Sequence, residues 1–138
     1  MSIALKPKYS SIAKSNIVPS RVLAVDDDRA MLMMLESKLQ EQGYDVITAR
    51  NGKEACSIIT KESNNIDVIL LDREMPEMDG YEVCRRLKAD AETAHLPVIM
   101  VTALDQPSDK IKGLEAGADD FLTKPVNDLA LTTRVRSL

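Results

Sequence analysis

The chain is poor in aromatic residues and in histidine, and it has no long apolar run. Its 138 residues include no Trp, one Phe and one His. So few aromatic side chains argue against a surface on which nucleic-acid bases stack, and a net charge of −4 argues against binding nucleic acid through charge alone. No stretch approaches the roughly 20 apolar residues of a membrane span, and no apolar secretory segment follows Met1. We therefore expect a cytoplasmic protein that binds neither nucleic acid directly nor a membrane.

Cysteine is almost as scarce, with two residues in the chain. Cys56 and Cys84 each lie in a helical pattern without a metal-ligating residue at short spacing. We therefore expect reduced, packed thiols rather than a disulfide or a zinc site. The one histidine, His95, precedes Leu96 and Pro97 in a predicted loop. A surface or structural role is therefore favoured over a role in phosphoryl relay.

The first 20 residues differ in composition from the rest of the chain. They carry Lys6, Lys8 and Lys14, no acidic residue and little hydrophobic periodicity. This composition predicts a flexible N-terminal leader over residues 1–20. A short segment that packs or binds a partner is the alternative. Residues 21–138 are expected to form the folded domain.

Hydrophobic periodicity predicts strands that alternate with helices along the whole of this domain. Strict alternation is typical of a doubly wound α/β fold, in which helices cover both faces of a parallel sheet. Asp28, Asp79 and Asn127 are expected to cap three of the helices. Periodicity leaves the order of the strands open. The strands are predicted at about 21–25, 44–48, 66–71, 98–101 and 119–123, and the helices at about 29–42, 52–63, 80–90, 108–116 and 127–138.

Polar residues follow four of the predicted strands, at the point where each strand ends. Asp26 and Asp27 follow the first strand, Asp72 the third, Thr102 the fourth and Lys124 the fifth. The carboxyl ends of parallel strands share one edge of the sheet, which is where ligands of open α/β sheets bind. The sequence therefore predicts a crevice that holds three carboxylates, a hydroxyl and an ammonium group.

This set of groups suits a divalent cation and a phosphoryl group. Mg²⁺ is bound through one or two carboxylates together with water and phosphate oxygens, so Asp27 and Asp72 could be direct ligands and Asp26 could act through water. Asp72 could also be the nucleophile of aspartyl-phosphate chemistry. Thr102 and Lys124 could each contact a phosphoryl oxygen. The alternative is that the acidic residues only cap helices.

The motifs around these residues resemble those of the receiver domain of two-component response regulators. The resemblance covers about residues 21–138 and depends on the joint presence of several motifs in this order and spacing. These motifs are Val-Asp-Asp-Asp at residues 25–28, Leu-Asp-Arg-Glu-Met-Pro-Glu-Met-Asp-Gly at 71–80, Val-Thr-Ala at 101–103 and Lys-Pro at 124–125.

The resemblance implies a flavodoxin-like sheet of five strands in the order 2-1-3-4-5. It also implies that Asp72 accepts a phosphoryl group from a sensor histidine kinase or a phosphotransfer protein. Asp26, Asp27 and Asp72, together with the backbone carbonyl of Glu74, would bind Mg²⁺. Such a domain is regulatory rather than an enzyme, and catalyses only its own phosphorylation and dephosphorylation.

The resemblance further implies a conformational switch that is read by an output domain or an effector protein. Thr102 and Lys124 would contact the phosphoryl group, with a cis bond between Lys124 and Pro125. As Thr102 moves, Phe121 would turn inward. The surface of the 108–116 helix, the fifth strand and the last helix would then change, and could form a homodimer. A structural role of Phe121 in the core is the alternative.

Two positions near the site tune the lifetime of the phosphoryl group in this family. They are occupied here by Glu74 and Leu104, neither of which suggests help for an attacking water, so we expect slow self-dephosphorylation. Within the family, residues 102–105, 113–125 and 134–138 look similar to the first receiver of PleD-type diguanylate cyclase response regulators. A diguanylate cyclase output is therefore one expectation.

Two other functions stay open from the sequence. A receiver could act as a dimerisation or adaptor module without phosphorylation, although the complete acidic set argues against this. A small phosphatase of the haloacid-dehalogenase type would use Asp26 and Asp28 as a D-x-D pattern, but this function would leave Asp72 and Thr102 at unusual spacing.

Overall fold

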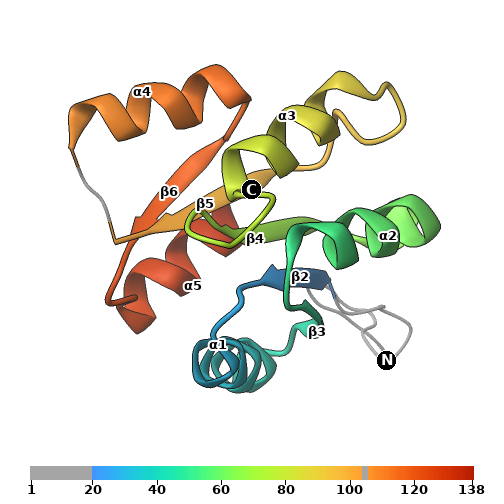
Figure 1. Cartoon of the computed structure of the whole chain (residues 1–138). Helices are drawn as coiled ribbons and strands as arrows, with labels where there is room; N and C mark the ends of the chain where they lie inside the picture. The colour runs from blue at the N-terminus through green and yellow to red at the C-terminus, as the bar shows by residue number, and fades with distance from the viewer. Residues whose placement is uncertain (1–19, 104–105) are drawn as a thin grey trace.

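The fold is a parallel sheet of five strands between two layers of helices (Figure 1). The computed structural model describes residues 20–103 and 106–138. Within these ranges no helix has the length and apolar character needed to cross a membrane. The elements, labelled as in Figure 1, are β2 (Arg21–Val25), α1 (Arg29–Glu41), β3 (Asp45–Ala49), α2 (Gly52–Glu62), the 3-10 helix η2 (Ser63–Asn65), β4 (Val68–Asp72), α3 (Gly80–Ala89), β5 (Val98–Thr102), α4 (Pro107–Ala116), β6 (Asp120–Thr123) and α5 (Asp128–Ser137).

The order of the strands across the sheet is β3-β2-β4-β5-β6, and every pair is parallel. Numbered along the chain, this is the expected order 2-1-3-4-5, and the flavodoxin-like fold is confirmed. The chain leaves β2 toward β3 on one side and returns to β4 on the other. This reversal opens a crevice at the carboxyl ends of β2 and β4, where open α/β sheets bind their ligands.

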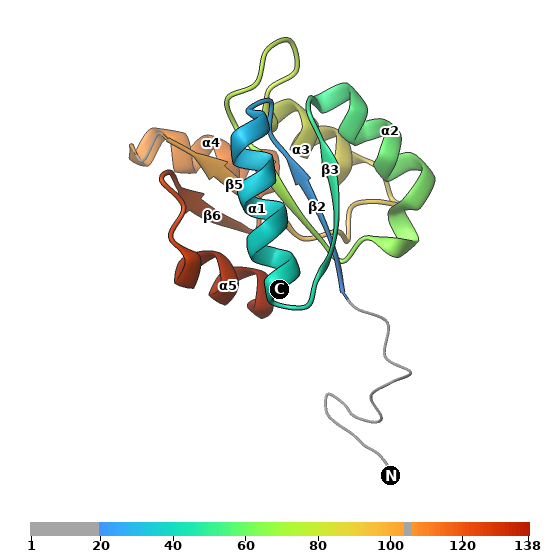
Figure 2. The same cartoon turned by 90° about the horizontal axis from the view of Figure 1, so that it is seen from below.

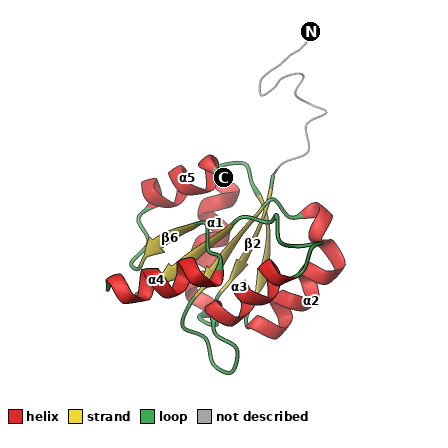
Figure 3. Ribbon diagram, turned by 90° about the horizontal axis from the view of Figure 1, so that it is seen from above, coloured by secondary structure: helices red, strands yellow, loops and turns green. Residues whose placement is uncertain are grey.

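Two hydrophobic layers separate the helices from the sheet. Helices α2, α3 and α4 cover one face, and α1 and α5 cover the other (Figure 1). Figure 2 shows α1 and α5 in front of the sheet, and Figure 3 shows α2, α3 and α4 from the opposite side. All residues of β4 and β5 are buried, as expected of strands that are covered on both faces.

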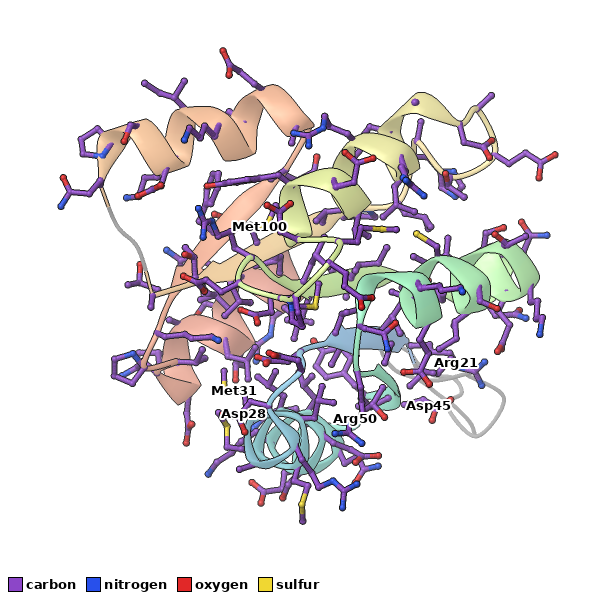
Figure 4. All side chains as sticks on the ribbon, in the orientation of Figure 1. Arg21, Asp28, Met31, Asp45, Arg50 and Met100 are labelled. Carbon is purple, nitrogen blue, oxygen red and sulfur yellow. The ribbon has the colours of Figure 1, made fainter. Side chains whose placement is uncertain are left out.

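Side-chain caps begin the helices where the sequence predicts them. Asp28 accepts hydrogen bonds from the backbone N–H groups of Ala30 (2.9 Å) and Met31 (3.3 Å), and Figure 4 shows Asp28 and Met31 together at the start of α1. Asp79 caps α3 and Asn127 caps α5 in the same way. Each such cap stabilises the fold by about 1 kcal/mol. The prediction of these three caps is confirmed.

The observed bounds of β2 match the predicted ones, and those of the other four strands differ by at most two residues. The third strand was expected at about 66–71, yet Asp72 is the last residue of β4 and Thr102 is the last residue of β5. The backbone ladder continues past the apolar run, because the N–H of Arg73 donates to the carbonyl of Val101 at 2.8 Å. Backbone pairing does not depend on the polarity of the side chain, so apolar periodicity ends before the strand does.

The two cysteines and the histidine have the environments that the sequence predicts. Cys56 and Cys84 are free thiols, half-buried and buried respectively, and His95 is exposed before β5.

At the amino-terminal edge of the sheet, the guanidinium group of Arg21 lies 2.7 Å from the carboxylate of Asp45 (Figure 4). The expected leader falls outside the described residues except for Ser20, and Leu104 also lies outside them.

Candidate functional site

The predicted acidic residues meet at the carboxyl edge of the sheet. Asp26 follows β2, and its backbone N–H donates to the carbonyl of Ala49 at 3.1 Å. The Asp26 carboxylate accepts the N–H of Asp28 at 2.9 Å. Asp72 ends β4, and one carboxylate oxygen from each of Asp26, Asp27 and Asp72 lies within 4.8 Å of the others. Asp26 and Asp72 are 1% and 2% exposed, whereas Asp27 is open to solvent.

Lys124 brings a positive charge into this acidic cluster. Its Nζ lies 2.9 Å from Oδ1 of Asp72 and 3.4 Å from Oδ2 of Asp26, and the side chain is 25% exposed. The backbone N–H of Lys124 donates to the carbonyl of Thr102 at 2.8 Å, which extends the pairing of β5 and β6 up to the site. The Lys124–Pro125 bond is cis, as the family resemblance implies.

The electrostatics of the cluster are governed by burial. Removal from water raises the pKa of the Asp72 carboxyl, while Lys124 lowers it and the nearby Asp26 raises it, so that the pKa rises to about 6. Burial alone would lower the pKa of the Lys124 ammonium. The ion pairs with Asp72 and Asp26 outweigh burial, so the pKa of Lys124 is raised overall and its positive charge is retained.

The donor set fits a divalent cation. Both carboxylate oxygens of Asp72 are buried, Oδ1 has an ion pair with Lys124, and a backbone hydrogen bond from Glu74 helps to lower the pKa of the carboxyl. Buried carboxylate oxygens that keep lone pairs free are ready metal ligands, and Mg²⁺ takes oxygen ligands while keeping several waters. One ammonium group leaves the three carboxylates with an excess of negative charge that a cation would relieve.

The hydroxyl and aromatic residues named from the sequence lie on neighbouring strands. Thr102, 6% exposed, ends β5, and its hydroxyl donates to Oε2 of Glu74 at 3.2 Å. Phe121 on β6 is half-buried against the core. A Cβ atom added to Gly113 would lie only 2.5 Å from Cε1 of the Phe121 ring, so the ring rests directly on α4 at this glycine.

Sequence reasoning missed two features around the end of β4. The resemblance gave Glu74 a backbone role in metal binding and a place among the residues that tune the phosphoryl lifetime, but it did not predict that the Glu74 side chain contacts Thr102. The guanidinium carbon of Arg73 lies 5.1 Å from the centre of the Tyr81 ring, within cation–π distance, and the Tyr81 hydroxyl donates to the carbonyl of Asp109 at 3.0 Å. These contacts connect the residue after Asp72 with the first turn of α4. No periodicity or motif marks contacts of this kind.

The tight packing of α3 against the end of β4 depends on one glycine. A Cβ atom at Gly80 would lie 2.5 Å from the backbone carbonyl oxygen of Asp72 and 2.9 Å from Cα of Arg73. Only a residue without a side chain allows this approach. Gly80 therefore fixes the start of α3 directly beside the end of β4.

Comparison with known proteins identifies the class of this site and fold. Residues 22–136 match the family model described as the response regulator receiver domain. Response regulator PleD of Caulobacter vibrioides is 50% identical over 119 residues, which cover 86% of this chain and 26% of PleD. The probable transcriptional regulator ycf27 of Porphyridium aerugineum is 43% identical over 118 residues, covering 86% of this chain and 47% of ycf27. The structure of chemotaxis protein CheY4 of Vibrio cholerae aligns with a TM-score of 0.82 and 33% identity, over 87% of this chain and 98% of CheY4.

These matches define a receiver domain of the kind found in two-component response regulators. The chain belongs to the response regulator receiver domain family, because the family model covers most of its length. The resemblance found from the motifs is confirmed, including the similarity to PleD. The chain spans about a quarter of PleD and about half of ycf27.

The burial of Asp72 predicts that an uncharged residue there stabilises the metal-free protein at high pH. Because the pKa of Asp72 is raised to about 6 in the fold, the folded state holds a proton that the unfolded state loses between the usual pKa near 3.8 and 6. Stability is therefore lost as pH rises through this window. The substitution Asp72→Asn removes this loss, so its stabilising effect should grow between pH 4.5 and pH 8, by a difference on the order of 2 kcal/mol.

Urea unfolding without Mg²⁺ at the two pH values measures this difference. Asp28→Asn is the matched control, because Asp28 is exposed and asparagine caps a helix equally well. An Asp72→Asn effect that is the same at both pH values would show that the buried carboxylate does not titrate in this range.

Proposed function

We propose that this domain is a phosphorylation-controlled switch in which Asp72 accepts a phosphoryl group from a sensor histidine kinase or a phosphotransfer protein. One observation carries the proposal: a buried carboxylate at the carboxyl end of a central strand lies beside two further carboxylates and 2.9 Å from an ammonium group. Phosphoryl transfer needs positioned groups and neutralised charge more than covalent chemistry from several side chains. The chain's membership of the receiver family supports the same reaction.

Each residue of the cluster has a separate task in this proposal. An oxygen of Asp72 forms the new bond to phosphorus, while the bond from phosphorus to the donor nitrogen breaks and the donor imidazole keeps that electron pair. Asp26, Asp27, Asp72 and the backbone carbonyl of Glu74 would hold Mg²⁺, which when bound supplies positive charge beside the phosphoryl oxygens. Lys124, whose Nζ lies 2.9 Å from Oδ1 of Asp72, supplies a second positive charge.

The switch in this proposal passes from Thr102 to Phe121. The Thr102 hydroxyl would turn to the phosphoryl group, and the Phe121 ring would leave Gly113 and move inward. The surface that changes lies on α4, β6 and α5, where Ile111 and Leu114 are 55% and 59% exposed and Leu129 is 75% exposed. An exposed apolar surface of this kind suits an output domain, an effector protein or a second copy of the chain.

The output and the setting of the switch are inferred from the resemblance. Similarity to PleD supports a diguanylate cyclase as one output, and similarity to ycf27, whose name describes a probable transcriptional regulator, supports a second kind. A cytoplasmic location, no direct binding of nucleic acid and slow self-dephosphorylation complete the proposal. The phosphatase alternative is weakened because Asp28, the second acid of its motif, caps α1.

The acceptor role of Asp72 is tested by phosphorylation with a small donor. In the presence of Mg²⁺ and acetyl phosphate, the intact mass of the wild type should increase by one phosphoryl group, and Asp72→Asn should show no increase. Asp67→Asn is the matched control, because Asp67 lies just before the same strand at the opposite edge of the sheet. An adduct on Asp72→Asn would contradict the proposal, and a complete absence of adducts would favour the adaptor function.

The position of the Phe121 ring is tested by a substitution at Gly113, the residue of α4 that the ring contacts. Gly113→Ala places a methyl group within 2.5 Å of the present ring, so the ring should be displaced from Gly113, as the proposed switch displaces it when the site holds an anion. Phe121 is the one Phe of the chain, so labelled phenylalanine gives a single set of ring resonances. We expect Gly113→Ala alone to shift these resonances in the direction that Mg²⁺ with beryllofluoride shifts them in the wild type.

Ser108→Ala, an exposed change in the same helix, is the control for effects on α4 itself. Phe121 resonances that respond to beryllofluoride but not to Gly113→Ala would show that the glycine does not set the ring position. Resonances that respond to neither would leave Phe121 as a core residue.

A further inference from the structure

Glu74 adds a fourth carboxylate at the carboxyl edge of the sheet, separate from the cluster of Asp26, Asp27 and Asp72. It lies two residues after Asp72 in the loop between β4 and α3, and its side chain is half-buried. Its carboxylate does not point at the three clustered aspartates but crosses to the end of β5. There, Oε2 accepts the hydroxyl of Thr102 at 3.2 Å, and Oε1 lies 3.5 Å from the backbone nitrogen of Ala103.

The carboxylate of Glu74 thus binds two donors with two oxygens, as an external anion would. Thr102 is almost fully buried, so its hydroxyl has little access to competing water. Hydrogen bonds to an ionised acceptor are stronger than those between neutral groups. Thr102 is also the residue to which the proposed function assigns a phosphoryl oxygen. One hydroxyl proton serves one acceptor at a time, so the two anions compete for it.

We propose that Glu74 is an internal competitor of the phosphoryl group. In the unphosphorylated protein its carboxylate occupies the hydroxyl of Thr102 and the N–H of Ala103, and it must leave before these donors turn to an anion on Asp72. Phosphorylation adds negative charge beside Glu74, and like-charge repulsion helps to expel it. This proposal rests on the proposed function. It means that the Glu74 side chain lowers the affinity of the site for an anion bound at Asp72.

Two substitutions separate the effect of the Glu74 charge from the effect of its hydrogen bond to Thr102. Glu74→Gln keeps an oxygen that can accept the Thr102 hydroxyl but removes the charge, and Glu74→Ala removes both. Neither changes the backbone carbonyl that is proposed as a metal ligand. Glu77→Gln is the matched control, because it removes the same charge from an exposed position in the same loop.

The experiment is a titration of each protein with beryllofluoride at a fixed, saturating concentration of Mg²⁺. The amide resonance of Ala103 and the ring resonances of Phe121 report binding. Glu74→Ala should bind beryllofluoride on the order of threefold to tenfold more tightly than the wild type, as expected when one competing hydrogen-bonded anion is removed. Glu74→Gln should lie between the two, and Glu77→Gln should match the wild type.

A readout without any anion tests the contact by itself. In the absence of beryllofluoride, the Ala103 amide resonance should shift in Glu74→Ala and stay in place in Glu77→Gln. Equal or weaker beryllofluoride binding by both Glu74 variants would overturn the competition but leave the proposed function standing. If beryllofluoride bound to none of the four proteins, the proposed function and the competition would both be overturned.

Discussion

The burial of two carboxylates beside one ammonium group is the constraint on which this domain depends. Asp26 and Asp72 are almost inaccessible to water, and Lys124 provides the nearby positive charge. Charges removed from water are costly unless they are paired, and here the pairing is incomplete because a third carboxylate lies within reach. This excess of negative charge favours a cation at the edge, and in the proposed function the cation and Lys124 together offset the negative charge of a phosphoryl group. The unbalanced charge of the cluster is therefore the feature that fits it for a divalent cation.

The surrounding fold holds this imbalance in place. Parallel pairing brings the ends of β2, β4, β5 and β6 to one edge, and backbone hydrogen bonds extend the pairing up to Arg73 and Lys124. Gly80 lets α3 press against the end of β4. Next to the cluster, Thr102 contacts Glu74, and Phe121 on the neighbouring strand contacts Gly113 of α4. A structural change at Asp72 could therefore reach α4 through a few directly contacting side chains. Tyr81 offers a second route through its hydrogen bond to Asp109.

The sequence predicts most of this arrangement, since alternation and strand-end residues are local signals. The three helix caps, the burial of β4 and β5 and the meeting of Asp26, Asp27, Asp72 and Lys124 all follow from patterns within a few residues. The strand order came from the family motifs, because periodicity carries no information on which strands are neighbours. The contact of Glu74 with Thr102 could not be predicted, because it joins residues 28 positions apart through side chains whose directions no pattern encodes. The contact of the Phe121 ring with Gly113 was not predicted for the same reason.

The most direct test of the central claim is a crystal structure of the wild type with Mg²⁺ and beryllofluoride. We predict beryllium bonded to a carboxylate oxygen of Asp72, a magnesium ion bound by the acidic cluster, and contacts to the fluorides from Thr102 and Lys124. A magnesium ion bound away from Asp26, Asp27 and Asp72, or beryllofluoride on another residue, would contradict the account.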